Sequence, residues 1–263
     1  MTAISVPVVA PNVVPVLNGF EITITDTDAI SVSAGIATDS GSRNYITSAT
    51  ALTIDTAISG AGGLDTGTIA ASTLYAVLVT GDSVNQNDGI VKAMLTLQST
   101  EATPTLPSPV VGGIQIGYDQ FRVVGYVLTD GSANLLSGVW FGKGADREFQ
   151  FATSLAVLAG GTSTSFATVD IDNAVPRQII PDGAEVGLNY AFTANADSDT
   201  FAFLTYGVTS TDGMQIFTGP EASAVAQAIT WIPTGLNSGV PAIQYKVSAG
   251  SLAASVFGYR VSL

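Results

Sequence analysis

The sequence predicts an all-β protein with two β-sandwich-like domains, jelly-roll or immunoglobulin-like, and an extended N-terminal arm. Apolar and polar residues alternate with a period of two in many short segments, which is typical of strands with one buried face. Turn-forming residues separate these segments every roughly 8–15 residues, as in a β-sandwich. Hydrophobic residues make up 46% of the 263 residues, so the chain has enough apolar surface to fill a core.

The chain begins with an apolar stretch that we expect to form the extended arm, over residues 1–19. Prolines at positions 7, 11 and 15 interrupt it, and it has no basic residue of the kind that opens a signal peptide. Alternation then starts at Ile22 and Ile24 and resumes at Ile30 and Val32, and we expect a turn at 26–28 between these two strands.

A hairpin is predicted next. Thr73–Thr80 and Ile90–Gln98 have the composition of strands, and the polar loop GDSVNQNDG lies between them. Ala102–Val110 contains three prolines, which cannot donate to a sheet, so we expect an extended connector there. Phe121–Thr129 and Leu135–Gly142 are predicted strands on either side of the turn DGSAN.

A domain boundary is predicted near residue 150, because the stretch from Gly142 to Thr153 gathers four charged residues, Lys143, Asp146, Arg147 and Glu148. The N-terminal domain would then span residues 20–148 and the C-terminal domain 149–263. Beyond the boundary, strands are predicted in SFATVDI, AEVGLNYAFTA, TFAFLTYGV, MQIFTG, IQYKVSA and SVFGYRVSL. Glu221–Ile232 is rich in alanine but ends in Thr-Trp-Ile, so we expect a single helical turn at most.

The composition excludes several kinds of chemistry. The sequence has no histidine and no cysteine, which removes the commonest metal ligand, thiolate nucleophiles, zinc and iron–sulfur sites, and disulfides. A formal net charge of −13, with eight scattered basic residues, argues against nucleic-acid binding. No apolar run reaches the length of about 18 residues that a membrane helix needs. We therefore expect no cofactor, no bound metal, no nucleic acid and no membrane insertion.

The stretch GGLDTGTIAASTLYAV, from Gly62 to Val77, places Asp65 in a glycine-rich turn before a strand. Glycine adopts positive φ readily, and an aspartate side chain accepts hydrogen bonds from nearby backbone amides, so a turn accounts for these residues. As a catalytic acid, Asp65 would need a second carboxylate or a base beside it, and the sequence has no recognisable partner. The glycines of Ser59–Gly63 lack the lysine and the following helix of a phosphate-binding loop.

Four segments follow one another along the chain: ISVSAGIATDSGSRNYI (Ile30–Ile46), GGLDTGTIAASTLYAV, PTLPSPV (Pro104–Val110) and FRVVGYVLTDGSANLLSGVWFG (Phe121–Gly142). In this order they resemble a β-rich module of tailed-bacteriophage structural proteins. The resemblance covers about residues 20–145. The second half, with GGTSTSFATVDIDNAVP followed by AEVGLNYAF, is more loosely similar to the terminal sandwich of phage fibres. The resemblance implies a virion surface component, often part of a tail fibre, without catalysis.

Three pairs of aspartates are candidate calcium ligands. Asp170 and Asp172, Asp197 and Asp199, and Asp26 and Asp28 are each two residues apart, which puts both carboxylates on one face of a strand. None has the further ligands of a calcium-binding loop, so we interpret them as solvated loop residues and expect no metal site.

Aromatic residues in the second half are candidates for a sugar-binding platform. Because alternating aromatics in a sandwich mostly fill the core, we interpret them as core residues. Tyr206, on the opposite parity to Phe201 and Phe203, is the better surface candidate. The full set is Tyr190, Phe192, Phe201, Phe203, Tyr206, Trp231, Tyr245 and Tyr259.

We expect a non-enzymatic virion structural protein, a tail fibre or tail-associated component on the particle surface, acting in assembly and host attachment. A chain with only 11% charged residues is expected to bury surface against copies of itself, and fibres of this kind imply a homotrimer. Other partners would be tail or head proteins of the virion and a host cell-surface glycan. The alternatives are a capsid decoration or head-fibre protein, and a carbohydrate-binding or depolymerase module.

Overall fold

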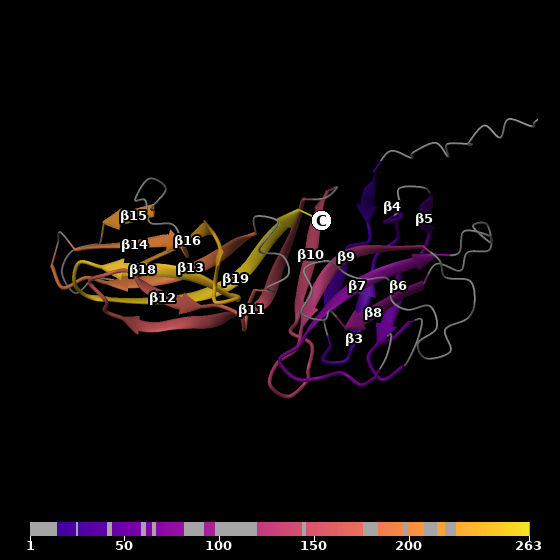
Figure 1. The fold of residues 1–263 in the computed structure, drawn as a ribbon, viewed down its shortest axis with the longest axis horizontal. Coiled ribbons are helices and arrows are strands. Elements are labelled where there is room, and N and C mark those ends of the chain that lie inside the picture. Colours follow the sequence, from indigo (N-terminus) through magenta and orange to yellow (C-terminus); the bar gives the residue numbers. More distant parts are fainter. Residues whose placement is uncertain are drawn as a thin grey trace, which may run out of the picture.

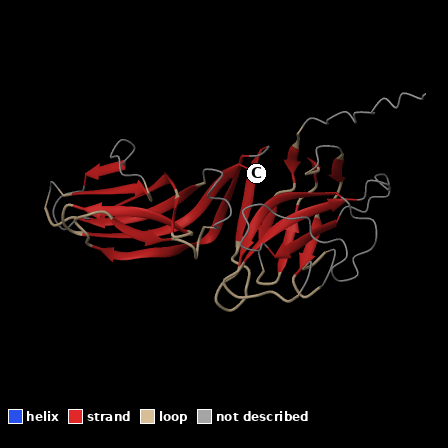
Figure 2. Cartoon of the chain, viewed as in Figure 1, coloured by secondary structure: helices blue, strands red, loops and turns tan. Residues whose placement is uncertain are grey.

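The structure is a computed structural model, and its regular elements are all β-strands (Figure 2). Nineteen strands lie in the residues that it describes. The all-β fold class predicted from the period-two alternation is therefore confirmed. The described residues are 15–24, 26–40, 44–58, 62–64, 67–81, 92–97, 120–143, 146–175, 184–196, 199–207, 215–218 and 225–262.

An eight-stranded antiparallel sheet runs through the molecule (Figure 1). Its two longest strands, β11 and β19, are neighbours near its middle and pair with each other from Asp146↔Ser262 to Gly161↔Leu252. Strands of the N-terminal half continue the sheet on one side of this pair and strands of the C-terminal half on the other. The order is β16 (Val225–Pro233), β13 (Glu185–Thr193), β19 (Ser251–Ser262), β11 (Asp146–Gly161), β10 (Gly138–Lys143), β2 (Ile22–Ile24), β3 (Ala29–Val32) and β6 (Leu52–Asp55).

In the C-terminal half, a five-stranded sheet packs against β13 and its neighbours. Alternation along β13 buries Tyr190 and Phe192. On β14 both faces are covered, and Phe201 and Phe203 are buried. The ring centres of Phe192 and Phe201 are 4.8 Å apart, and those of Tyr190 and Phe201 are 4.9 Å apart. The five strands are β12 (Ala167–Asp170), β18 (Val240–Val247), β14 (Thr200–Thr205), β15 (Gln215–Thr218) and β17 (Gly235–Asn237).

The N-terminal half contains two three-stranded sheets. One has the order β1 (Leu17–Gly19), β4 (Gly35–Thr38) and β5 (Tyr45–Ser48), and the other β8 (Lys92–Leu97), β7 (Leu74–Gly81) and β9 (Gln120–Leu128). All eight residues of β7 are buried, as in a strand covered on both faces. The predicted hairpin is confirmed, since β7 and β8 pair antiparallel with Tyr75 opposite Leu97. Its tip and the proline-rich connector lie outside the described residues.

Aromatic side chains pack where β10, β11 and β19 lie side by side. The buried Trp140 ring is 5.5 Å from the ring of Phe149 and 5.3 Å from that of Tyr259, centre to centre. Its indole N–H donates to the carbonyl of Tyr126 at 2.7 Å. These contacts join strands that are more than a hundred residues apart in sequence, because β19 ends beside the start of β11.

The charged stretch that suggested a domain boundary forms part of this shared sheet. Residue 148, where the boundary was predicted, lies within β11. Arg147 is only 2% exposed and donates from Nη2 to the carbonyl of Gly19 at 2.7 Å. Burial lowers the pKa of its guanidinium, and the charge of Glu21 acts in the opposite direction. The division into residues 1–19, 20–148 and 149–263 stays a prediction.

Two sequence predictions concern the ends of sheets. Leu17–Gly19, the last residues of the predicted arm, form β1 and pair with β4 from Leu17↔Ala37 to Gly19↔Gly35. Residues 1–14 lie outside the described residues. In the alanine-rich segment Glu221–Ile232, the described part is strand β16 from Val225 onward, which agrees with the expectation of a single helical turn at most.

Candidate binding surface

The described aspartates mostly hold loops in shape. Asp199, which is 7% exposed, accepts the backbone N–H groups of Asn195 and Ala196 at 2.7 and 2.8 Å. Asp130 accepts the N–H groups of Asn134 and Ser132 at 2.9 and 2.8 Å. Hydrogen bonds from Asn134 and then Ser132 lower the pKa of Asp130. Side-chain bonds of this kind stabilise tight turns.

Asp170, one of the calcium candidates, lies at the end of β12 and takes part in a chain of side-chain hydrogen bonds. Its carboxylate accepts from the amide of Asn237 at 3.2 Å, and the carbonyl of that amide accepts from the Tyr206 hydroxyl at 2.9 Å. Asp172 follows, exposed, in the turn after the strand. Tyr206 is half-buried, and its hydroxyl is hydrogen-bonded to Asn237 of β17.

The remaining predicted acids do not converge on a common point in the described structure. Asp26 and Asp28 are exposed in the bend between β2 and β3, as the predicted turn requires. Asp197 and Asp65 lie outside the described residues. Beside Asp65, Gly62 has a φ of 87° and its carbonyl accepts the N–H of Asp55 at 2.8 Å, which is turn geometry.

Two further features are absent from the described ranges. No group of three or more His, Cys, Asp or Glu residues there is placed to hold a metal ion. No helix in the same ranges is long and apolar enough to cross a membrane.

The aromatic candidates are mostly core residues, as interpreted from their alternation. Tyr190, Phe192, Phe201, Phe203, Tyr245 and Tyr259 are all buried. Trp231 differs, since it is half-buried on the face of the eight-stranded sheet that points away from the sandwich core. Its strand neighbour Ile232 is 3% exposed and points inward.

Tyr259 gives a prediction about alkaline pH. Burial, and then the neighbouring Tyr126, raise the pKa of Tyr259 well above its ordinary value. The raised pKa belongs to the folded state, so the neutral hydroxyl of Tyr259 stabilises the fold at pH values below the unfolded pKa of about 10. This stabilisation is lost as the pH rises above that unfolded pKa. We expect Tyr259→Phe to lessen the fall of the unfolding free energy above pH 10 by about 1.4 kcal/mol per pH unit, measured by urea denaturation. An unchanged slope would contradict this placement of Tyr259.

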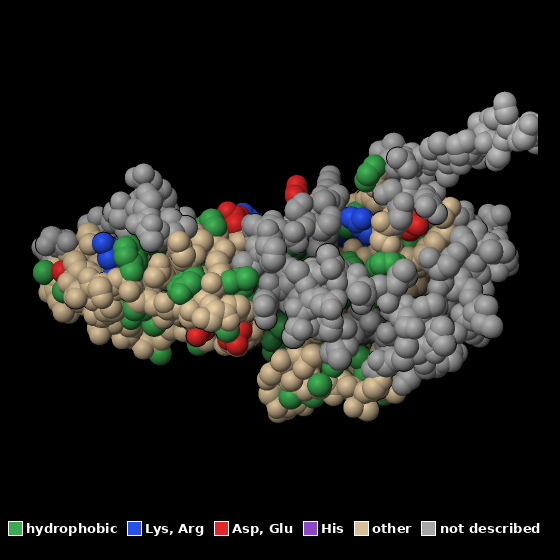
Figure 3. Space-filling model, viewed as in Figure 1, with side chains coloured by type: hydrophobic (Ala, Val, Ile, Leu, Met, Phe, Trp, Pro, Cys, Tyr) green, Lys and Arg blue, Asp and Glu red, His purple; other side chains and the backbone are tan. Residues whose placement is uncertain are grey.

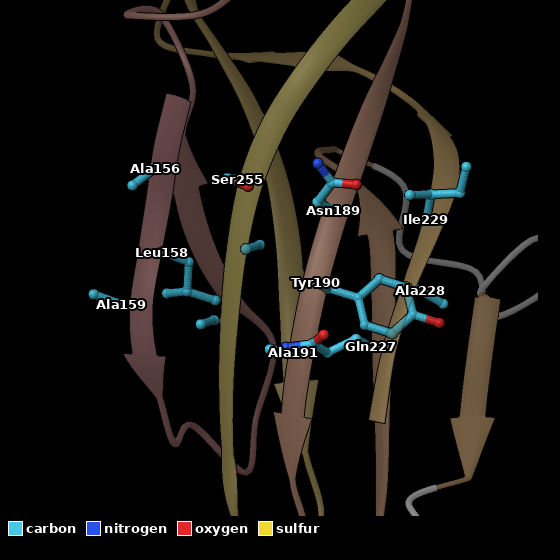
Figure 4. A pocket seen from close by; sticks show the side chains of 12 residues that line it. Ala156, Leu158, Ala159, Asn189, Tyr190, Ala191, Gln227, Ala228, Ile229 and Ser255 are labelled. Carbon is cyan, nitrogen blue, oxygen red and sulfur yellow. The ribbon is translucent and has the colours of Figure 1, made fainter. Parts of the chain in front are cut away.

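An open groove of about 610 Å³ lies over β11, β19, β13 and β16 (Figure 4). On β13, Leu188 and Phe192 are buried, so the alternating residues Asn189 and Ala191 project from the opposite face. The amide of Asn189 donates to the hydroxyl of Ser154 at 2.9 Å, across this face. The outward side chains that line the groove are Ala156, Asn189, Ala191, Gln227, Ile229, Ala253 and Ser255.

The groove is hollow because its floor carries small side chains. In one row across the sheet, Ile229 of β16 is opposite Asn189, which is opposite Ser255, which is opposite Ala156. The large member of the row, Ile229, is at the edge and is 64% exposed. None of the lining residues is charged, although the chain carries a formal charge of −13. Charged side chains are also sparse on the face shown in Figure 3.

A polar and aromatic cluster lies on the same four strands as the groove. The guanidinium carbon of Arg260 is 3.7 Å from the centre of the Trp231 ring, a cation–π contact. Arg260 also donates to Glu148 at 2.9 Å and lies 3.7 Å from Glu185. The Phe257 ring packs edge-on against Trp231, with ring centres 5.1 Å apart. The cluster fixes the indole beside the groove.

Sequence analysis did not identify the groove. Its lining comes from four strands between positions 156 and 255, and single Ala, Ser, Asn and Gln residues at outward positions resemble any exposed strand face. The available signal was the small size of these outward residues, since an exposed sheet face normally carries longer charged side chains.

Comparison with known proteins shows no family. No family model and no curated protein matches the chain. Solved structures with weak similarity include the Bacillus endospore appendages, a family of disulfide-linked pili (TM-score 0.23, 12% identity, 43% of this chain and 92% of that one). Infectious bursal disease virus strain Gx gives 0.22 and 14%, over 95% and 72% of the two chains.

A carbohydrate-binding module from a Cellvibrio mixtus lichenase gives a TM-score of 0.20 and 11% identity, over 49% of this chain and 86% of that one. The structural neighbours thus include an appendage protein, a virus structure and a carbohydrate-binding module, each with low sequence identity to this chain.

Proposed function

We propose that the chain is a non-enzymatic structural protein of a bacteriophage virion, a tail-fibre or tail-associated component that acts in assembly and host attachment. The observation that carries the proposal is the eight-stranded sheet shared by both halves of the chain. Such a sheet transmits load through backbone hydrogen bonds and needs no cofactor. The carboxylates of Asp199 and Asp130 stabilise turns and that of Glu148 forms a surface ion pair, which is what a scaffold requires of them.

The phage-like motifs supply the second line of support. In FRVVG, the last residue is Gly125, and a Cβ placed there would lie 2.7 Å from Ile22 and 3.1 Å from the Trp140 ring. The glycine of this motif therefore lets β9 approach the tryptophan at the centre of the aromatic packing. A packing role for a motif residue fits a structural module better than a catalytic one.

A virion role is tested by locating the protein on purified phage particles. Antibodies against the chain should label the tail when added to purified particles of the phage that encodes it, seen by electron microscopy. Label on the capsid shell would replace the tail assignment with the decoration or head-fibre alternative. Absence of the protein from purified particles, judged by mass spectrometry, would contradict a virion role of either kind.

Glycan binding is a second candidate function, favoured by the half-buried Trp231 and Phe257 rings on the same sheet face as the amides of Asn189 and Gln227. Aromatic faces and amide groups are typical of sugar sites. The candidate requires saturable binding of a host polysaccharide that Trp231→Ala abolishes. As a control, Tyr45→Ala alters an aromatic residue that is 39% exposed in the other half of the chain and should leave binding unchanged. Cleavage of the polysaccharide would contradict the non-enzymatic proposal.

A further inference from the structure

Strand β16 is an edge of the eight-stranded sheet, and among the described strands it pairs only with β13. Its first half is open on both faces, because the consecutive residues Gln227, Ala228 and Ile229 are all exposed. Val225 is 54% exposed and Ile229 is 64% exposed. An apolar edge of this kind offers backbone hydrogen-bonding groups to another strand.

Except for Pro233 at its end, the edge lacks the features by which proteins block such pairing. Natural edge strands carry lysines or other charges, prolines within the strand, or bulges. From Val225 to Ile232 there is no charged residue and no proline. The nine residues of β16 pair with β13 without a register shift, so no bulge twists the edge away.

The backbone direction of β16 can be assigned from the residue that follows it. The N–H of Thr234 donates to the carbonyl of Ala184, on the β13 side, at 3.0 Å. In an antiparallel pair the N–H and C=O groups of alternate residues point to the same side. Odd-numbered residues of β16, including Val225, Gln227 and Ile229, therefore direct their backbone groups to the side away from β13. Pro233, which has no N–H, also lies on that parity.

The strand is complementary to itself. Ile229 is the middle residue of Val225–Pro233, and its backbone groups point outward. A two-fold axis at Ile229 would set two such residues opposite each other as a hydrogen-bonded pair, with Gln227 facing Trp231. The pairing would end there, because Pro233 has no N–H and its carbonyl already accepts from the Thr205 hydroxyl at 2.9 Å. The exposed Ile229 side chains would then cover each other beside the two grooves.

We propose that β16 pairs antiparallel with β16 of a second copy about this two-fold axis, joining the two eight-stranded sheets into one. The occupant is a second copy because the contact is neutral and isologous. Two chains of charge −13 repel at most surfaces, and this edge has no charge that would oppose their approach. The inference goes beyond the proposed function, and for the isolated chain it gives a two-fold contact in place of the expected three-fold one.

The test is the molar mass of the full chain, measured by light scattering after size-exclusion chromatography at micromolar and higher concentrations. We expect twice the mass of one chain, and a fall to a single chain in Ile229→Lys, because an ammonium group at the axis would face its own copy. Val139→Lys places a lysine on another outward residue, 41% exposed on β10, and should leave the doubled mass unchanged.

A second variant tests the backbone contact itself. Ile229→Pro removes an outward N–H but none of the hydrogen bonds to β13, and it should also give a single chain, with circular dichroism confirming the strand content. A wild-type chain that is monomeric at all concentrations would overturn the proposal. So would a dimer or trimer whose mass neither substitution at Ile229 changes. Neither result depends on whether the protein is found in virions.

Discussion

Replacing Trp140 with alanine is expected to lower the free energy of unfolding by about 4 kcal/mol. The indole is fully buried against Phe149 and Tyr259, so its removal leaves a large cavity between β10, β11 and β19. The carbonyl of Tyr126 also loses the hydrogen bond that it accepts at 2.7 Å. Urea denaturation, followed by circular dichroism because a tryptophan is lost, measures the change.

The adjacent residue supplies the control for Trp140. Val139 lies on the same strand but points outward and is 41% exposed. Val139→Ala should change the unfolding free energy by less than about 1 kcal/mol, as surface substitutions usually do. A similar loss in both variants would mean that Trp140 is not in the core between the three strands.

Replacing Gly258 with alanine is expected to cost about 3 kcal/mol of unfolding free energy. Gly258 lies in β19, between Gln150 of β11 and Gly187 of β13. A Cβ there would lie 2.2 Å from the carbonyl oxygen of Phe149 and 3.3 Å from the Cα of Gln150. Both are backbone atoms, so the contact cannot be relieved by moving a flexible side chain. The two strands would have to separate where they pass between the halves of the chain.

Gly131→Ala is the matched control for Gly258, measured by the same urea denaturation. No atom lies within 4 Å of a Cβ placed at Gly131, and this glycine does not have a positive φ. We expect a change within about 0.5 kcal/mol. If Gly258→Ala is equally mild, β11 and β19 are not packed as closely at this point as the structure has them.

Much of the strand content could be predicted because alternation reports burial directly. Ile22, Ile24, Ile30 and Val32, chosen from their period of two, are all buried in β2 and β3, and the bend at 26–28 lies between them. The aromatic residues of β13 and β14 were likewise assigned to the core from parity alone. In β2, β3 and β13 one face is largely covered and the other is not, so the pattern in the sequence matches the environment. In β14 the other face is buried as well, through Ala202 and Leu204.

The features that escaped prediction depend on which strands become neighbours. Arg147 was interpreted as part of a charged boundary, but the pairing of β10 with β11 buries it against the carbonyl of Gly19. The alanines of β16 favour a helix locally, and pairing with β13 over nine residues overrides that preference. The groove needs side chains from β11, β19, β13 and β16 together, and spacing along the chain does not show that they meet.

The measurement that most directly tests the continuous sheet uses the two tryptophans of the chain, one in each half. Trp231→Phe leaves Trp140 as the reporter of the N-terminal half, and Trp140→Phe leaves Trp231 as the reporter of the C-terminal half. A sheet shared through β11 and β19 predicts that fluorescence and circular dichroism give the same urea midpoint within each variant. Fluorescence and circular dichroism transitions that separate in either variant, one half unfolding before the other, would contradict a single β-scaffold.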